Sequence, residues 1–199
     1  LSFYEYCQLL QLDDMPLLPD HLKITDIPKM ENAEVADLMA RFEPLVKHFN
    51  RYLTIGGFPE LALSDDDLYA QRMLREDVVD KVIKRDVLTL FKVRSPLLME
   101  KLFLYLCMNS TEIFSATTAA KELDNISPNT IESYVDALVK SNLIYMAYPI
   151  AVGSKSVLKG RPKIYIADAA IRNAVLMVDD VLSDERELGL LIETTVYKH

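Results

Sequence analysis

The sequence is poor in several residue types, and the shortage of cysteine excludes one class of protein. Tryptophan is absent, and only five glycines and two cysteines occur among 199 residues. Cys7 and Cys107 lie far apart within apolar runs, which indicates two buried thiols in a reducing cytoplasm and excludes a disulfide framework. No apolar run is long enough to cross a bilayer, and the opening Leu1-Ser-Phe is neither an initiator Met nor a signal peptide. We therefore expect a cytoplasmic fragment of a longer protein, without a membrane partner.

Basic residues are outnumbered by acidic ones. The chain has 22 Lys and Arg against 30 Asp and Glu, so its formal net charge is −8. Proteins that bind nucleic acid through its phosphates usually carry the opposite sign. The charge therefore argues against bulk nucleic-acid binding, while a local basic patch stays open. Half of the residues are hydrophobic, an ordinary balance for a globular protein that buries a core.

Motifs for catalysis and cofactor binding are missing from the sequence. There is no Gly-x-x-x-x-Gly-Lys-Ser/Thr loop to cradle phosphates, and no nucleophile is paired with a base. The three histidines, His21, His48 and His199, lack metal-ligand spacing. Runs of acids such as Asp65–Asp67 lie at helix starts, where capping explains them better than acid–base chemistry. We predict no catalytic, cofactor or metal residue, and so no enzyme activity of this chain.

Residues 1–92 carry the pattern of a small all-helical region. Apolar residues at helical spacing predict a short helix over 2–12 and a longer run over 33–53. Pro44 interrupts the longer run, by a kink or by the start of a fresh helix. The acids and prolines of 13–29 predict an irregular connector between the two.

The longest predicted helix covers about 66–91 and begins with three aspartates, which suit the positive end of a helix dipole. It follows Gly56-Gly57-Phe58-Pro59, which ends the preceding run as a turn. Near its end, Arg85 adjoins Asp86. Arg85 is a candidate arginine finger toward a neighbouring subunit's nucleotide, although a structural ion pair with Asp86 is the favoured reading.

Residues 96–140 fit a helix-turn-helix. Three helices are predicted, over about 96–109, 115–123 and 127–140. Ser115 and Ser127 are the expected N-caps of the second and third helices, and Pro128 takes the first position of the third. Asn125 suits the left-handed turn between them.

Two strand-like segments follow, over 143–148 and 163–167, with a loop rich in Gly, Ser and Lys between them. Three helices, a strand, a basic loop and a second strand form the order of a winged helix-turn-helix. The predicted fold is therefore mainly α with a small β wing. It comprises a helical region over 1–92 and a winged helix-turn-helix domain over 93–178.

Direct DNA contact would place the third helix in the major groove and the wing on the backbone. The candidate contact residues, for DNA or for a partner, are then Asn129, Thr130, Ser133, Lys155, Lys159, Arg161 and Lys163. Against DNA, residues 96–149 hold six acids and three bases. Glu132 and Asp136 lie on the exposed side of the third helix, where they would repel phosphates. Packing or protein contact is favoured, with DNA binding as the alternative.

Five short motifs, in this order, resemble a family of prokaryotic AAA-type ATPases that carry a C-terminal domain of unknown function. They are Leu1-Ser-Phe-Tyr-Glu-Tyr, Gly56-Gly-Phe-Pro-Glu60, Arg85-Asp-Val87, the pattern Ala-Lys-Glu-Leu…Ile-Ser…Asn-Thr over 120–130, and Lys163-Ile-Tyr-Ile-Ala-Asp168 with Ile171-Arg-Asn173. The resemblance covers 1–178. One departure is Asp124-Asn125, where the family often has a single Gly.

The resemblance implies that this chain is the non-catalytic part that follows the ATPase domain. ATP and Mg²⁺ are then expected in that preceding domain, with none bound here. The implied partners are the chain's own ATPase domain and another protein, with DNA as the alternative and an oligomer left open. Gly189-Leu-Leu-Ile-Glu193 resembles the opening of a restriction-endonuclease-like domain, so 179–199 is read as the start of a truncated one.

Overall fold

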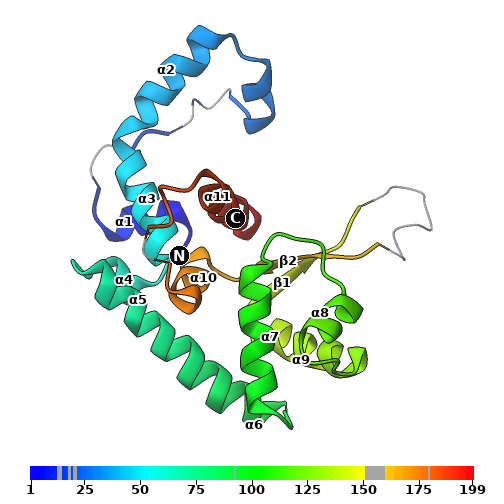
Figure 1. Ribbon diagram of the computed structural model, residues 1–199. Helices are drawn as coiled ribbons and strands as arrows, with labels where there is room; N and C mark the ends of the chain where they lie inside the picture. Colours follow the sequence, from blue (N-terminus) through cyan, green and yellow to red (C-terminus); the bar gives the residue numbers. More distant parts are fainter. Residues whose placement is uncertain (13–14, 18, 20–21, 92, 151–159, 179) are drawn as a thin grey trace.

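The computed structural model describes residues 1–199 except 13–14, 18, 20–21, 92, 151–159 and 179. It is mainly helical, with one small antiparallel sheet (Figure 1). The elements of the first 92 residues are α1 (Phe3–Leu9), η1 (Ile24–Lys29), α2 (Asn32–Phe42), η2 (Glu43–Leu45), α3 (Val46–Ile55), α4 (Pro59–Ala62), α5 (Asp67–Arg75), η3 (Glu76–Val87) and α6 (Leu88–Leu90). The remaining elements are α7 (Pro96–Met108), α8 (Ala116–Glu122), α9 (Pro128–Lys140), β1 (Ile144–Ala147), β2 (Lys163–Ile166), α10 (Ala169–Leu176) and α11 (Glu185–Lys198).

The run predicted over 33–53 is two helices, because Pro44 lies in the 3-10 turn η2 that separates α2 from α3. Of the two predicted alternatives at Pro44, the start of a new helix is the one observed, and a single kinked helix is not. α3 ends at Gly56, whose φ of 76° is the left-handed conformation expected of a glycine cap. α2 has no buried residue and extends away from the other helices (Figure 1). The predicted connector over 13–29 contains one short 3-10 helix, η1.

The long helix predicted over 66–91 is present as α5, η3 and α6 in succession. Asp66 is its N-cap and accepts a hydrogen bond from the Tyr69 amide at 2.9 Å. Its middle part, η3, is π-helical, which the sequence pattern did not predict. Leu90, an apolar residue near the end of this helix, is 72% exposed and lies off the buried face. A π-helical stretch turns less per residue, so the residues after it are displaced around the axis.

α7 begins at Pro96 as predicted. Its fully buried residues are Met99, Leu102, Phe103, Leu106 and Cys107. Leu97 and Leu104, which are also apolar, are exposed. Because α7 is apolar around most of its circumference, hydrophobic spacing alone does not select the face that packs.

The sheet pairs β1 with β2 in antiparallel register, from Ile144 opposite Ile166 to Ala147 opposite Lys163. Segment 111–114 runs along the other side of β2. The Thr111 amide donates to the Ile164 carbonyl at 2.7 Å, and the Ile164 amide donates to the Glu112 carbonyl at 3.1 Å. β2 therefore lies between two backbone partners, of which only β1 was predicted.

The largest hydrophobic core joins the long helix to α7, α8, α9, the strands and α10. Leu74, Ile83 and Val87 of the long helix pack in the same cluster as Phe103 and Ile131. The core thus contains residues from both sides of the predicted boundary at 92/93. α11 packs against α3, α10 and β2, and its assignment to a nuclease-like domain stays a prediction.

Candidate interface around helix α9

α9 is positioned by its buried side and presents the other side to solvent. Ile131, Tyr134, Val135 and Leu138 are buried, as the spacing predicts. Ser127 takes the N-cap position, but its hydroxyl makes no capping hydrogen bond, because the Thr130 amide donates to the Ser127 carbonyl at 2.9 Å.

The turn between α8 and α9 sets the angle at which α9 is held. Both Asp124 and Asn125 are left-handed, with φ of 63° and 56°. The Ile126 amide then reaches back to the Ala120 carbonyl at 3.0 Å, which closes the end of α8. Asn125 was predicted for this role, and Asp124 adds a second residue in the same conformation.

The candidate residues Asn129, Thr130 and Ser133 lie together along one groove of about 690 Å³. Arg94 and Ser95, just before α7, line the same groove. The Ser95 amide donates to the Tyr134 hydroxyl at 3.0 Å, which ties this segment to α9. Sequence reasoning missed Arg94. No local pattern in the sequence signals it, because Arg94 reaches this groove only through the packing of α7 against α9.

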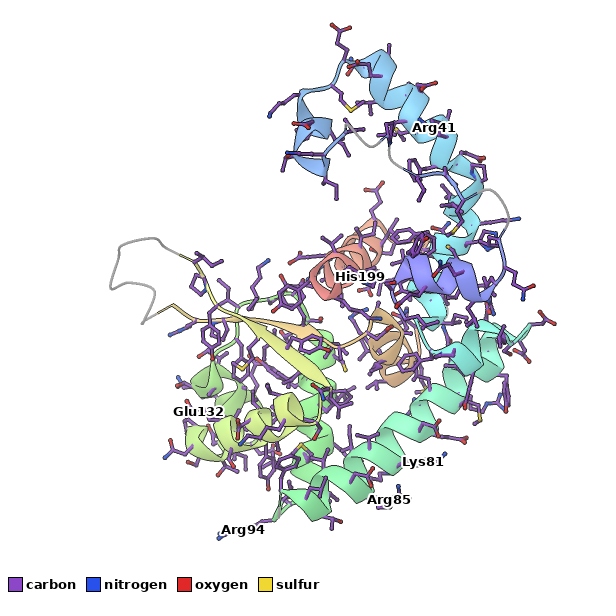
Figure 2. All side chains as sticks on the ribbon, turned by 180° about the vertical axis from the view of Figure 1, so that it is seen from behind. Arg41, Lys81, Arg85, Arg94, Glu132 and His199 are labelled. Atoms are coloured by element: carbon purple, nitrogen blue, oxygen red, sulfur yellow. The ribbon has the colours of Figure 1, made fainter. Side chains whose placement is uncertain are left out.

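The acids of α9 line a second groove, of about 780 Å³, on another side of the helix. Asp136 is paired with Lys140, one helical turn later, at 2.6 Å. Glu132 is exposed and has no ion pair or hydrogen bond with another described residue. Figure 2 shows Arg94 and Glu132 pointing outward from different sides of this helical region. Asp136 lines both grooves, whereas Arg94 lines only the first and Glu132 only the second.

The candidate wing residues do not form one basic surface in the part of the chain that the structure describes. Lys155 and Lys159 lie outside the described residues. Arg161 is exposed and lines the acidic groove. Lys163 is engaged by α11, because its Nζ lies 2.9 Å from Oε1 of Glu193.

Glu193 accepts a second hydrogen bond on the same oxygen, from the Tyr165 hydroxyl at 2.8 Å. The hydrogen bond from Lys163 lowers the pKa of Glu193, and burial together with the bond to Glu193 raises the pKa of Tyr165 to about 12. Glu193 is therefore charged and Tyr165 neutral at physiological pH. This arrangement directs Lys163 toward α11, where it is less available to a phosphate.

Arg85 projects into solvent from the long helix (Figure 2), and its Nε lies 2.9 Å from Oδ1 of Asp86. The ion pair favoured from the sequence is present. Its role as an arginine finger stays a prediction.

A polar junction, formed by Tyr52, Gly57, Asp168, Lys198 and His199, accounts for the Gly-Gly motif. Lys198 Nζ lies 2.6 Å from Asp168 Oδ2 and 3.2 Å from the Tyr52 hydroxyl. The Gly57 amide donates to the same Asp168 oxygen at 3.3 Å, and His199 Nε2 lies 3.0 Å from the Tyr52 hydroxyl. Burial raises the pKa of Tyr52, so its hydroxyl stays protonated. These groups satisfy one another, which makes the junction a packing contact between segments far apart in the sequence.

Among the residues that the structure describes, no three His, Cys, Asp or Glu side chains come together as metal ligands. None of the helices among these residues has the length and apolar character that a bilayer span requires.

The fold and the α9 region define a mainly helical protein that presents two grooves along one helix. The chain belongs to the family described as "Domain of unknown function (DUF8612)", whose model matches residues 46–182. It is also 24% identical over 182 residues to "Uncharacterized protein MJ1544" of Methanocaldococcus jannaschii. That match covers 88% of this chain and 39% of the relative, so the chain spans about two-fifths of the relative's length. No solved structure matches the chain.

Proposed function

We propose that this chain is a non-catalytic accessory module with a winged helix, and that the module contacts a partner protein. The observation that carries the winged-helix reading is the position of β2. It lies between β1 and segment 111–114, and β1 itself follows the three helices α7, α8 and α9. A winged helix predicts this central position for its last strand.

The charges around α9 support a protein partner over DNA. Glu132 is unpaired with any described residue, and Asp136 shares its groove. A phosphate backbone approaching this side would meet like charge in a chain whose net charge is already −8. One of the expected basic contacts, Lys163, is bound to Glu193.

DNA binding is the alternative, and one observation favours it. Asn129, Thr130 and Ser133 share a groove with Arg94, so short polar groups and a base meet along α9, with Asp136 at the same groove. Such a surface would contact base edges with the polar groups and a phosphate with the arginine.

A band-shift titration over a range of salt concentrations separates the two. We expect no retarded band with duplex DNA, even at low salt. A salt-sensitive shift that Arg94→Glu and Arg161→Glu both weaken, and that Arg41→Glu does not, would replace the protein-contact proposal with DNA binding. Arg41 is the matched control because it is an exposed arginine on α2, remote from α9 (Figure 2).

We further propose that the parent protein is an AAA-type ATPase and that this module couples its nucleotide state to the partner. Support comes from the five motifs in register and from the short share of the relative that the chain spans. The test is the gene region that encodes residues before Leu1. A phosphate-binding loop within about one domain's length upstream, with ATP hydrolysis by the longer protein, would support the proposal, and its absence would overturn it.

A further inference from the structure

The backbone groups of β2 point alternately to its two neighbours. Ile164 exchanges hydrogen bonds with segment 111–112, and the Pro162 carbonyl accepts from the Phe114 amide at 2.8 Å. On the other side, the Ala167 amide donates to the Leu143 carbonyl at 2.9 Å. Even-numbered residues of β2 thus face segment 111–114, and odd-numbered residues face β1.

The register then determines which backbone groups of β1 are free. Tyr145 and Ala147 are opposite Tyr165 and Lys163, so they face β2. Met146 lies between them and directs its amide and carbonyl away from β2. No described residue forms a hydrogen bond with either group. β1 therefore presents an open strand edge, which can accept another strand.

The larger groove adjoins this strand and is lined by apolar and aromatic groups. Met146 and Tyr148 line it from the strand side, and Val135 and Val139 line it from α9. Its volume of about 780 Å³ is typical of a binding site, and Tyr148 is 60% exposed. Tyrosine is enriched where proteins bind one another, because it combines a large apolar ring with a hydroxyl.

The charges of the groove specify the kind of segment that fits. Glu132 stands exposed on the α9 wall, without an ionic partner in the described chain. Asp136 lies one turn later and is paired with Lys140 at 2.6 Å, and Arg161 lines the groove as its one described base, so Glu132 is the acid left to pair with an incoming cation. Successive side chains of an added strand point to opposite faces of the sheet, so Lys or Arg directed toward α9 would alternate with apolar side chains on the other face, where Tyr145 and Tyr197 line the same groove.

We propose that the free edge of β1 binds an extended segment of a partner protein, with alternating basic and apolar residues, as an added strand. The inference rests on the proposed contact with a protein and names its mode. Main-chain hydrogen bonds to Met146 would supply affinity, and Glu132 would select the basic residues.

The test uses a synthetic peptide of alternating Lys and Val, seven residues long, with a Glu–Val peptide of the same length for comparison. We expect the Lys peptide to bind and to slow hydrogen exchange at the Met146 amide. Glu132→Lys should lower the affinity for the Lys peptide by about fivefold or more and raise the affinity for the Glu peptide. Glu122→Lys is the matched control, an exposed acid on α8 outside this groove, and it should change neither affinity.

Met146→Pro removes the outward donor and leaves the groups of Tyr145 and Ala147 that face β2. It should abolish peptide binding while the circular dichroism stays unchanged. If this variant fails to fold, exchange at the Met146 amide in the wild-type chain still decides the question.

Three outcomes would overturn the inference: no binding of the Lys peptide, binding that leaves Met146 exchange unchanged, or binding insensitive to Glu132→Lys. Protection of Met146 that grows with protein concentration in the absence of peptide would identify a second copy as the occupant instead. The band-shift assay measures DNA binding, and the upstream gene region tests the ATPase parent, whereas this inference is tested by peptide binding and by hydrogen exchange at Met146. Failure of this inference is thus distinguishable from failure of the proposed function.

Discussion

Arg172 is 4% exposed and is held by two partners. Its Nε donates to the Cys107 carbonyl at 3.0 Å, and its two terminal nitrogens donate to Glu187 at 2.6 and 3.2 Å. A buried guanidinium is stable only when its charge is paired and its donors are used. Through this residue, α10 is connected to α7 and to α11.

Replacing Arg172 by Met should lower the free energy of unfolding by about 2–4 kcal/mol, because Glu187 and the Cys107 carbonyl both lose a partner. We expect a loss near the lower end of this range, because the Glu187 carboxylate is partly exposed and water can still solvate it. Urea unfolding measures the change. Arg186→Met is the control, since Arg186 is exposed and its ion-pair distance to Glu112 is 3.7 Å. A loss no larger than the control's would contradict the role given to Arg172.

The two glycines Gly56 and Gly189 should respond to alanine in opposite directions. Gly56 has a φ of 76°, and an added Cβ would meet the carboxylate of Asp168. Gly56→Ala should therefore destabilise the chain by at least about 1–2 kcal/mol. Gly189 lies inside α11 with open space around it, so Gly189→Ala should stabilise by about 0.5–1 kcal/mol. Equal effects in thermal unfolding would refute the conformational argument.

At the scale of the element, the α8–α9 turn depends on two consecutive left-handed residues. Asn125→Val should cost about 1–2 kcal/mol, because a β-branched side chain is strained at positive φ. Asn125→Gly, which keeps the conformation, should stay close to the wild type. Chemical denaturation of both variants tests this, and a tolerated valine would show that the turn adopts another conformation.

Elements with strong local signals were predictable from the sequence. Asp66 and Ser115 accept the capping hydrogen bonds expected of them, and Pro128 opens α9. Features that depend on tertiary contacts were not. The packed face of α7 is chosen by its neighbours, and segment 111–114 becomes strand-like only because β2 lies beside it.

The candidate site was predictable to a similar degree. The spacing of α9 placed Asn129 and Ser133 on its exposed side, where they lie. Arg94 joins them only through the folded arrangement of α7 against α9, and no local pattern signals it. Lys163 was predicted as a contact residue, but the fold pairs it with Glu193, which lies thirty residues later in the sequence. The wing residues Lys155 and Lys159 remain predictions.

At the scale of the whole molecule, ion pairs connect α11 to the rest of the structure. It joins the sheet through Lys163 and Glu193, and α10 through Arg172 and Glu187. The family match ends at residue 182, before α11 begins, and starts at residue 46, where α3 begins. The shared unit therefore crosses position 92, and its core includes both the long helix and the strands.

The ion pair between Lys163 and Glu193 should weaken in acid. The hydrogen bond from Lys163 lowers the pKa of Glu193 from its ordinary value of 4.5. A group with a lowered pKa in the folded state stabilises the fold above its unfolded pKa, and this contribution is lost as the pH falls through the folded value. The difference in urea midpoint between the wild type and Glu193→Gln should therefore be larger at pH 7 than at pH 3. A difference independent of pH would show that the charge of Glu193 does not stabilise the fold.

The two ends of the described chain meet at the polar junction, where Lys198 Nζ lies 3.3 Å from the Leu1 carbonyl (Figure 1). A linker of a few residues would close the backbone into a ring without disturbing the helices. Such a cyclic molecule would have fewer unfolded conformations to lose on folding, and it should melt at a higher temperature than the linear chain.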